Sequence, residues 1–191
     1  MDAYLPIGLI AVAVILLVGF VGYIISLYNS LIQVKNNIEK AWANIDVLIL
    51  QRHDELPQLI GTVKGYIKHE RELLIKITTL RAGYQEAETI DEKTRIENDL
   101  NREMGRLRLT LEQYPDLKAS QNFLQLQDRI SAIEASIADR RELFNDSVNI
   151  YNIHIERFPE AVLAKKFNFR RHAFLSIPEE SKQEIDVALS R

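Results

Sequence analysis

The feature that most limits what this chain can fold into is an apolar run from Ile7 to Leu27. No charged residue lies between Asp2 and Lys35. At about 1.5 Å of rise per residue, a helix over this run crosses a hydrocarbon core of about 30 Å, so the sequence predicts a transmembrane helix. A cleaved signal peptide is the competing interpretation. The length of the run, the lack of Lys or Arg before it and the lack of a clean cleavage site favour the span.

The charges beside the run predict its direction. Only Asp2 precedes it, whereas Lys35 and Lys40 follow it. Basic residues favour the cytoplasmic side, so we expect the amino terminus outside the cell and the rest of the chain in the cytoplasm. The bias is small, and a body on the external side is the alternative.

One face of the predicted span carries mostly small residues, which lets two membrane helices approach closely. Spacings of three and four place on this face Gly8, Ala11, Gly19, Gly22 and Ser26, with Ile15 among them. The pattern predicts self-association into a homo-oligomer. The alternative is that glycine is simply frequent in membrane helices.

The rest of the chain has a composition typical of an all-α protein. Only 7 Gly and 5 Pro occur in 191 residues, and 27% of the residues are charged. Apolar residues recur every three or four positions in four segments, predicting helices at about 29–53, 55–86, 90–114 and 120–158. Short turns make neighbouring helices alternate in direction. We therefore expect a membrane anchor (1–28) continuous with a long antiparallel, up-down four-helix bundle (29–158), followed by a tail (159–191).

The turns of this bundle are marked by helix breakers and caps. Pro57 interrupts the pattern and Asp54 suits a helix cap, so we expect the chain to reverse there. A kink within one helix is the alternative. Thr89, with Glu92 three residues later, predicts a capping box for the third helix.

The tail combines basic and aromatic side chains, which suit a membrane surface with anionic head groups. These residues are Lys165, Lys166, Phe167, Phe169, Arg170 and Arg171. The antiparallel order brings the tail back toward the membrane, so we expect it to contact lipid. Packing against the bundle or a neighbouring subunit is the alternative. The net charge of -3 gives no reason to expect a nucleic-acid partner.

No motif for catalysis or metal binding is present. The four His residues form no His-Glu-x-x-His or Glu-x-x-His pair, and the chain has no Cys. Gly61 to Gly65 lacks the Lys-Ser/Thr of a phosphate loop. We expect a protein that is not an enzyme, with no cofactor, metal or small-molecule substrate.

Polar and aromatic residues inside the predicted bundle form a separate candidate group. If the helices alternate, they lie at similar heights: Trp42, Asn44, Asp46, Tyr66, Tyr151 and Asn152, with Asn149 nearby. A buried hydrogen-bonded network of this kind specifies packing, and ligand binding is the alternative.

Several segments resemble the LemA family across nearly the whole chain. They are Tyr28-Asn29-Ser30-Leu31, Ala41-Trp42-Ala43-Asn44-Ile45-Asp46-Val47, Thr62-Val63-Lys64-Gly65-Tyr66 with His69-Glu70, Tyr114-Pro115 with Leu117-Lys118-Ala119, Phe123 with Leu126-Gln127, Phe144-Asn145 with Tyr151-Asn152, and Phe158-Pro159. The resemblance implies a protein of the bacterial cell (inner) membrane with one amino-terminal span and a bundle of long helices.

The chain departs from the family pattern at three places. Leu48 to Leu50 are apolar where basic residues are usual, Asn168 replaces the usual glycine, and no proline occurs around His172-Ala173.

Two functions follow as hypotheses. In the first, the protein is a membrane-anchored scaffold that self-associates into a higher-order homo-oligomer and rests its tail on lipid. In the second, it is a membrane-tethered adaptor that presents a helix face to another membrane protein, such as a protease or a signalling component.

Overall fold

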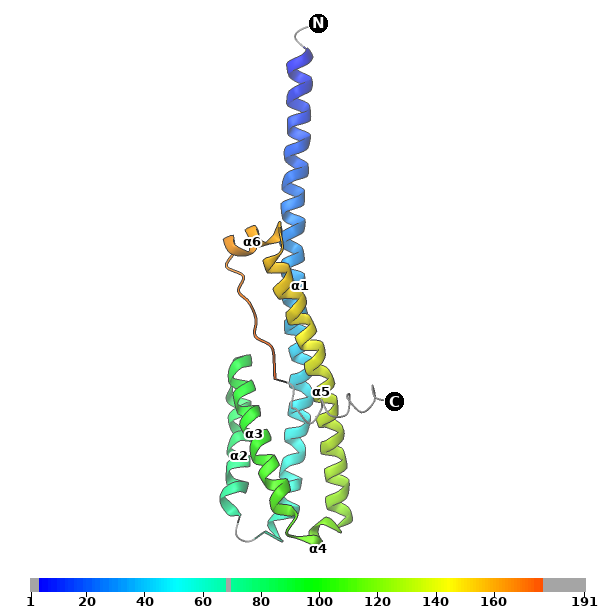
Figure 1. Ribbon diagram of the computed structural model, residues 1–191, viewed down its shortest axis with the longest axis vertical. Helices are drawn as coiled ribbons and strands as arrows, with labels where there is room; N and C mark the ends of the chain where they lie inside the picture. Colours follow the sequence, from blue (N-terminus) through cyan, green and yellow to red (C-terminus); the bar gives the residue numbers. More distant parts are fainter. Residues whose placement is uncertain (1–3, 68–69, 177–191) are drawn as a thin grey trace, which may run out of the picture. The chain divides into compact units, whose positions relative to one another are not determined.

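The computed structural model describes residues 4–67 and 70–176, and their side chains from residue 8 onward. Every element in this part of the chain is a helix, so the all-α prediction is confirmed (Figure 1). The helices are α1 (Tyr4–Lys64), α2 (Arg71–Glu86), α3 (Ile90–Leu111), α4 (Pro115–Lys118), α5 (Gln121–Glu156) and α6 (Glu160–Lys166). Residues 177–191 of the predicted tail lie outside the described residues.

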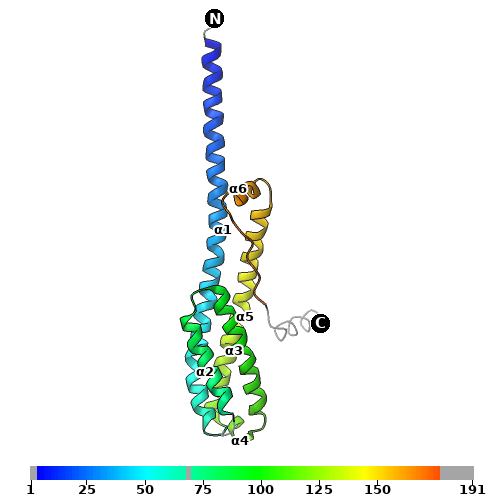
Figure 2. The same ribbon diagram turned by 90° about the vertical axis from the view of Figure 1, so that its left-hand side faces the viewer.

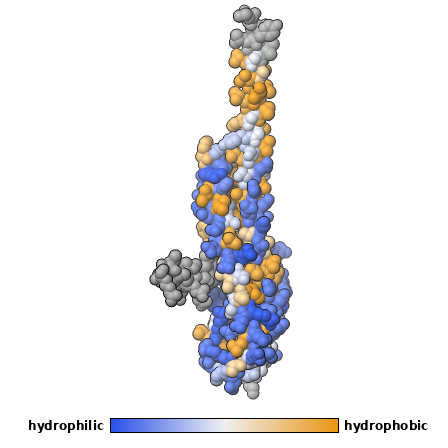
Figure 3. All heavy atoms as spheres, turned by 90° about the vertical axis from the view of Figure 1, so that its right-hand side faces the viewer, coloured by the Kyte–Doolittle hydropathy of each residue, from blue (hydrophilic) through white to orange (hydrophobic). Residues whose placement is uncertain are grey.

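Residues 8–23 of α1 are mostly apolar and exposed. The most apolar 18-residue window has a mean hydropathy of 2.8, and none of it is buried. Figure 3 shows the orange apolar side chains along this part of α1. An uncovered apolar helix of this length suits a lipid environment rather than water. The structure therefore contains one helix long and apolar enough to cross a membrane.

The expected reversal at Pro57 was wrong, because α1 continues through this residue to Lys64. Its buried positions recur in steps of three and four on both sides of Pro57, so one face stays in phase throughout. They are Leu31, Val34, Ile38, Trp42, Ile45, Ile49, Arg52, Leu56, Leu59 and Val63. Arg52 takes one place in this series, so a buried charge lies on an otherwise mostly apolar face. The chain breaks only after Lys64.

Pro57 is accommodated inside α1 by a contact from another helix. A proline has no N–H, so it leaves the carbonyl four residues earlier without its helical hydrogen bond. That carbonyl belongs to His53, and Arg81 Nε of α2 donates to it at 2.8 Å. A side chain from α2 thus replaces the missing helical hydrogen bond.

The other helix ends agree in part with the predictions. Thr89 and Glu92 form the predicted capping box, with both hydrogen bonds at 3.2 Å. Pro115 begins the short α4, which the sequence did not predict. Pro159 lies between α5 and α6, and α6 was also unexpected because seven residues are too few for a clear periodic pattern.

The described residues fall into two compact units. The first contains residues 4–41 of α1 and residues 144–174, which include the end of α5 and all of α6. Figure 2 shows the end of α5 and α6 beside α1. Apolar residues of these three helices are buried in this unit. They are Leu31, Val34, Ile38, Phe144, Val148, Tyr151, Ile155, Leu163 and Ala164.

The second unit contains residues 42–143 together with Leu175 and Ser176. Here α2 packs against α3, and residues from α1, α4 and α5 complete the core. The largest cluster includes Leu56, Leu59, Val63, Ile77, Leu100, Leu107, Leu117, Phe123 and Ile130. The alternating four-helix bundle remains a prediction.

Candidate functional site

The predicted self-association face lies along the exposed part of α1. Its five residues, Gly8, Ala11, Gly19, Gly22 and Ser26, are all exposed. A Cβ atom added at any of the three glycines would meet nothing within 4 Å. The fold of a single chain therefore does not require glycine at these positions, and self-association stays a prediction.

A group of aromatic and basic side chains packs beside the carboxyl end of the apolar segment, within the first unit. We call it the collar and define it as Tyr28, Lys165, Lys166, Phe167, Phe169, Arg170 and Arg171. The Tyr28 ring contacts the Phe167 ring at a centroid distance of 4.9 Å and the Phe169 ring at 6.3 Å. Tyr28 is the first residue after the apolar run, so these rings fix the collar at the end of the predicted span.

The backbone turn that presents the collar depends on Asn168. The Phe169 N–H donates to the Ala164 carbonyl at 2.9 Å, and the Asn168 N–H donates to the Lys165 carbonyl at 3.4 Å. These are the two hydrogen bonds of a Schellman motif, which needs a left-handed residue after the helix. Asn168 has a φ of 63°, and asparagine tolerates this conformation better than most residues. Replacing the family's usual glycine therefore still permits the turn.

Two residues of the predicted polar network hold the segment after this turn. Tyr151 Oη donates to the Arg170 carbonyl at 3.0 Å. Asn152 Nδ2 donates to the His172 carbonyl at 3.0 Å, and the His172 N–H donates to Asn152 Oδ1 at 3.1 Å. The segment is thereby held against α5 through its backbone, and the His172 ring also packs edge-on against the Tyr151 ring.

The cations of the collar are exposed to solvent. This holds for Lys165, Lys166, Arg170 and Arg171, although Arg171 pairs with the exposed Glu156 at 2.9 Å. Phe167 and Phe169 contact the Tyr28 ring, although Phe167 is 51% exposed, and the cations lie at the surface. Contact of the tail with lipid stays a prediction.

The second unit contains a buried ionic cluster that the sequence did not predict. Glu97 of α3 accepts a hydrogen bond from Arg52 of α1, lies 3.4 Å from His53 Nε2, and lies 4.0 Å from a guanidinium nitrogen of Arg141 in α5. Arg52 also donates to Asn101 Oδ1 at 2.8 Å. Arg52, His53, Glu97 and Arg141 are all buried, so one carboxylate connects three helices.

A hydrogen-bonded group adjoins this cluster. Tyr84 Oη donates to Asp46 Oδ1 at 2.6 Å, and Lys93 Nζ lies 3.0 Å from both oxygens of Asp46. The Tyr84 ring packs edge-on against the His53 ring, with centroids 4.8 Å apart. Burial, together with the hydrogen bond to Asp46 and its charge, raises the pKa of Tyr84 above its usual range, so Tyr84 acts as a neutral donor.

The charge of Glu97 is maintained by its neighbours. Burial alone would raise its pKa, but the nearby His53 ring and the positive charges of Arg52 and Arg141 outweigh this and lower the pKa. Glu97 is therefore an ionised carboxylate at neutral pH. The arrangement resembles a structural ion cluster, in which one buried carboxylate is shared by two guanidinium groups and approached by a histidine ring.

The six residues predicted to form one polar network belong to the two different units, and a single network of all six stays a prediction. Asp46 bonds Tyr84 and Lys93, whereas Tyr151 and Asn152 bond the segment at 170–172. Trp42 is buried, but Asn44 and Tyr66 are exposed. Sequence reasoning missed Arg52, His53, Glu97 and Arg141. Arg52 and Glu97 occupy apolar-seam positions of their helices, and that mismatch was the available signal.

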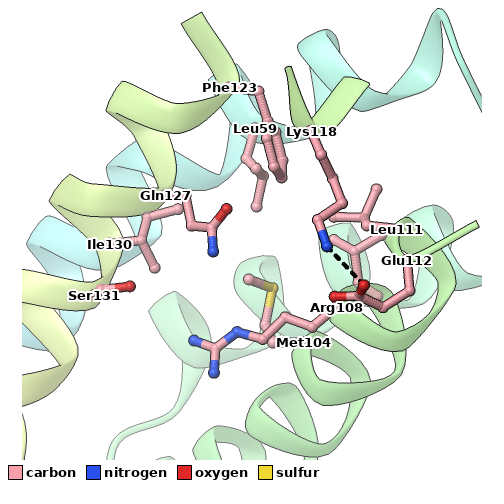
Figure 4. A pocket seen from close by; sticks show the side chains of 11 residues that line it. Leu59, Met104, Arg108, Leu111, Glu112, Lys118, Phe123, Gln127, Ile130 and Ser131 are labelled. Atoms are coloured by element: carbon pink, nitrogen blue, oxygen red, sulfur yellow. Dashed lines mark hydrogen bonds and ion pairs between the residues drawn. The ribbon is translucent and has the colours of Figure 1, made fainter. Parts of the chain in front are cut away.

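A cavity of about 150 Å³ lies among α1, α3, α4 and α5 in the second unit. Figure 4 shows Leu59, Met104, Leu111, Phe123 and Ile130 around it, with Lys118 and Glu112 at one side. Lys118 Nζ lies 2.6 Å from Glu112 Oε2. The Arg108 guanidinium pairs with Glu134. The cations beside the cavity are thus satisfied by neighbouring carboxylates, and we assign no ligand to it. Within residues 8–67 and 70–176, no three His, Asp or Glu side chains group as metal ligands.

The chain is similar in sequence to one protein family and to several individual proteins. The family model of the LemA family matches residues 41–189. Protein LemA of Metamycoplasma hominis is 28% identical over 162 residues, which cover 84% of this chain and 74% of that protein. Magnetosome protein MamQ of Magnetospirillum gryphiswaldense is 21% identical over 189 residues, which cover 85% of this chain and 70% of that protein. Magnetosome protein MamQ 2 of Paramagnetospirillum magneticum is 21% identical over 190 residues, which cover 86% of this chain and 70% of that protein.

Proposed function

We propose that this chain, which belongs to the LemA family, is a membrane-anchored scaffold that self-associates into a homo-oligomer at the bacterial cell membrane. The exposed apolar helix and the family relationship indicate a membrane-associated protein. The finer elements of the proposal are self-association, a body that acts through its surfaces rather than by catalysis, and the absence of a cofactor, nucleic-acid partner or small-molecule substrate.

The observation that carries this proposal is the unoccupied space at the glycines of α1. Glycine lowers the stability of a helix by about 1 kcal/mol relative to alanine. Gly8, Gly19 and Gly22 contact nothing within their own chain that would explain this cost. Close approach of a second membrane helix supplies such an explanation, because small residues let two backbones meet.

The proposal includes an arrangement for the body. We expect α1, α2, α3 and α5 to form an antiparallel four-helix bundle, since the connections between successive helices are short. We expect this body in the cytoplasm, because Lys35 and Lys40 follow the span and only Asp2 precedes it.

The test is the mass of the full chain purified in detergent. We expect a homo-oligomer by light scattering coupled to size exclusion, and a shift toward monomer when Gly19→Leu and Gly22→Leu are combined. Because an added Cβ meets nothing within the chain, the substitutions should leave helix content unchanged. Ala13→Leu enlarges a residue on the opposite face and serves as the matched control. A wild-type monomer, or a mass unaffected by the double substitution, would contradict the proposal.

The adaptor function is a second candidate because α5 presents apolar side chains to solvent. Ile150 and Ile153 are each 50% exposed and lie three residues apart on one face of the helix. An uncovered apolar face is a common property of interaction surfaces. A monomeric wild-type chain that crosslinks in membranes to one other protein would support the adaptor over the scaffold.

A further inference from the structure

The collar combines three properties in one place: aromatic rings, exposed cations and a fixed position next to the apolar part of α1. Tyr and Trp side chains are frequent at the edge of a membrane, where one end of the ring is apolar and the other is hydrated. Tyr28 holds this position, and Phe167 and Phe169 pack against its ring. The collar is therefore tied to the end of the apolar segment by direct contacts.

The charges around the collar are strongly unbalanced. Residues 156–174 contain five Lys and Arg side chains and two carboxylates. Glu160 is buried and pairs with Arg157, and Glu156 pairs with Arg171. In the described part of the chain, no carboxylate forms an ion pair with Lys165, Lys166 or Arg170.

Apolar side chains accompany the cations on the surface. Val162 of α6 is 62% exposed, and Phe158 before it is 84% exposed. A surface with apolar side chains beside cations matches the boundary between acyl chains and anionic head groups. In a soluble environment the same exposed Phe would be unfavourable.

We propose that the collar, with Phe158 and Val162 beside it, is a binding surface for the phosphate groups of anionic phospholipids. This inference rests on the membrane anchoring in the proposed function, but not on self-association. Lys165, Lys166 and Arg170 contact the phosphates, while Phe158 and Val162 insert among the lipid chains. Each cation near an anionic surface strengthens the attachment about fivefold.

The experiment uses the full chain in nanodiscs, with one chain per disc. Because the sequence has no Cys, Val162→Cys gives a single site for an environment-sensitive fluorophore. Quenching by lipids with a spin label on the acyl chain reports contact with the membrane. Discs contain phosphatidylcholine alone, or phosphatidylcholine with about one-third phosphatidylglycerol, at low and high salt. Leu109→Cys, on an exposed position of α3, is the control label.

We expect quenching at position 162 in the phosphatidylglycerol discs, reduced by salt and weaker in phosphatidylcholine alone. Lys165→Gln with Lys166→Gln should weaken the lipid contact about 25-fold, since two cations are lost. Lys165→Arg with Lys166→Arg keeps both charges and should preserve the contact. Arg102→Gln with Arg106→Gln removes two exposed cations from α3 and should change nothing.

Equal quenching with and without the anionic lipid would overturn the inference, as would an unchanged signal in the Gln variant. Circular dichroism of the Gln variant identifies any loss of helix, and the Arg variant tests the charge independently of the fold. Anion-dependent quenching in the discs, together with a monomeric mass in detergent, would contradict the scaffold and still support the lipid contact. An oligomer in detergent, together with quenching that does not depend on the anionic lipid, would support the scaffold and contradict the lipid contact.

Discussion

Glu97 is a buried charge that contacts side chains of two other helices in the second unit. Its carboxylate is buried between Arg52 and Arg141, and His53 approaches it at 3.4 Å. Apolar packing accepts many arrangements of similar energy, whereas an ion cluster is satisfied in one. Removing one member leaves the remaining buried charges uncompensated, which is strongly destabilising. We expect Glu97 to fix which faces of α1, α3 and α5 meet.

The first prediction concerns this carboxylate. Glu97→Gln should lower the free energy of unfolding at pH 7 by about 3 kcal/mol, because Arg52 and Arg141 lose their buried counter-charge. Glu142→Gln, at an exposed position of α5, should change it by less than about 0.5 kcal/mol. Denaturant unfolding of the full chain in detergent, followed by circular dichroism, measures both. Equal effects of the two substitutions would contradict the role given to Glu97.

The same residue predicts a dependence on pH. The folded-state pKa of Glu97 lies below its ordinary value of 4.5, so its stabilising contribution is complete above that pH and is lost as the pH falls through the lower folded-state pKa. Wild-type stability should therefore fall below about pH 4.5, and Glu97→Gln should show a shallower fall. The stability of the variant should still fall with decreasing pH, because the pKa values of Glu103 and Glu160 are lowered as well. An unchanged slope in the variant would exclude Glu97 as a contributor.

Single residues were the part of the structure least accessible to sequence reasoning. The polar network was sought among the Trp, Asn and Tyr residues of the recognisable motifs, yet the buried charges are Arg and Glu. On an isolated helix these residues look like a solvated surface. Only their positions in the apolar series of α1 and α3 distinguish Arg52 and Glu97 from their exposed neighbours.

At the scale of elements, helix starts with side-chain signals were predicted better than helix ends. Thr89 and Glu92 identified the start of α3, because a capping box depends on neighbouring residues alone. The prediction of a reversal at Pro57 was wrong because the effect of this proline depends on a distant residue. Arg81, 28 positions after His53, donates to the His53 carbonyl. The sequence around Pro57 cannot predict that a side chain from another helix will replace the missing hydrogen bond.

The second variant experiment tests this replacement. Arg81→Met should lower the free energy of unfolding by about 2 kcal/mol, because the His53 carbonyl loses its donor. Pro57→Ala restores the helical N–H for the same carbonyl. In that background Arg81→Met should therefore be less harmful by about 1 kcal/mol, a coupling that a double-mutant cycle measures. Additive effects would show that Arg81 acts through something else, such as its longer ion pair with Asp54 at 3.8 Å.

At the scale of the whole molecule, the chain combines an exposed apolar helix with a body whose charges are largely paired. The all-helical class and the family were accessible from sequence, because both depend on patterns repeated over many residues. The division into two compact units was not predicted, since it depends on which contacts form rather than on helix periodicity.

The proposed sidedness can be tested on the intact protein. Ile75→Cys introduces a single thiol at an exposed position of α2. If the positive-inside rule decides the topology, a membrane-impermeant maleimide should label this thiol in inverted vesicles but not in intact spheroplasts. A thiol placed just after Met1 should show the reverse. Labelling of Ile75→Cys in spheroplasts would place the body outside the cell.

The distance along the chain between Arg52 and Glu97 has a consequence for synthesis. The two residues are separated by 45 positions, and Arg141 follows later still. As the chain leaves the ribosome, the apolar span and Arg52 emerge well before the carboxylate that neutralises Arg52. The guanidinium must stay hydrated during that interval, so the nascent body cannot close until α3 is complete. For the proposed membrane-anchored protein, we therefore expect the apolar segment to enter the membrane before the second unit closes around Arg52.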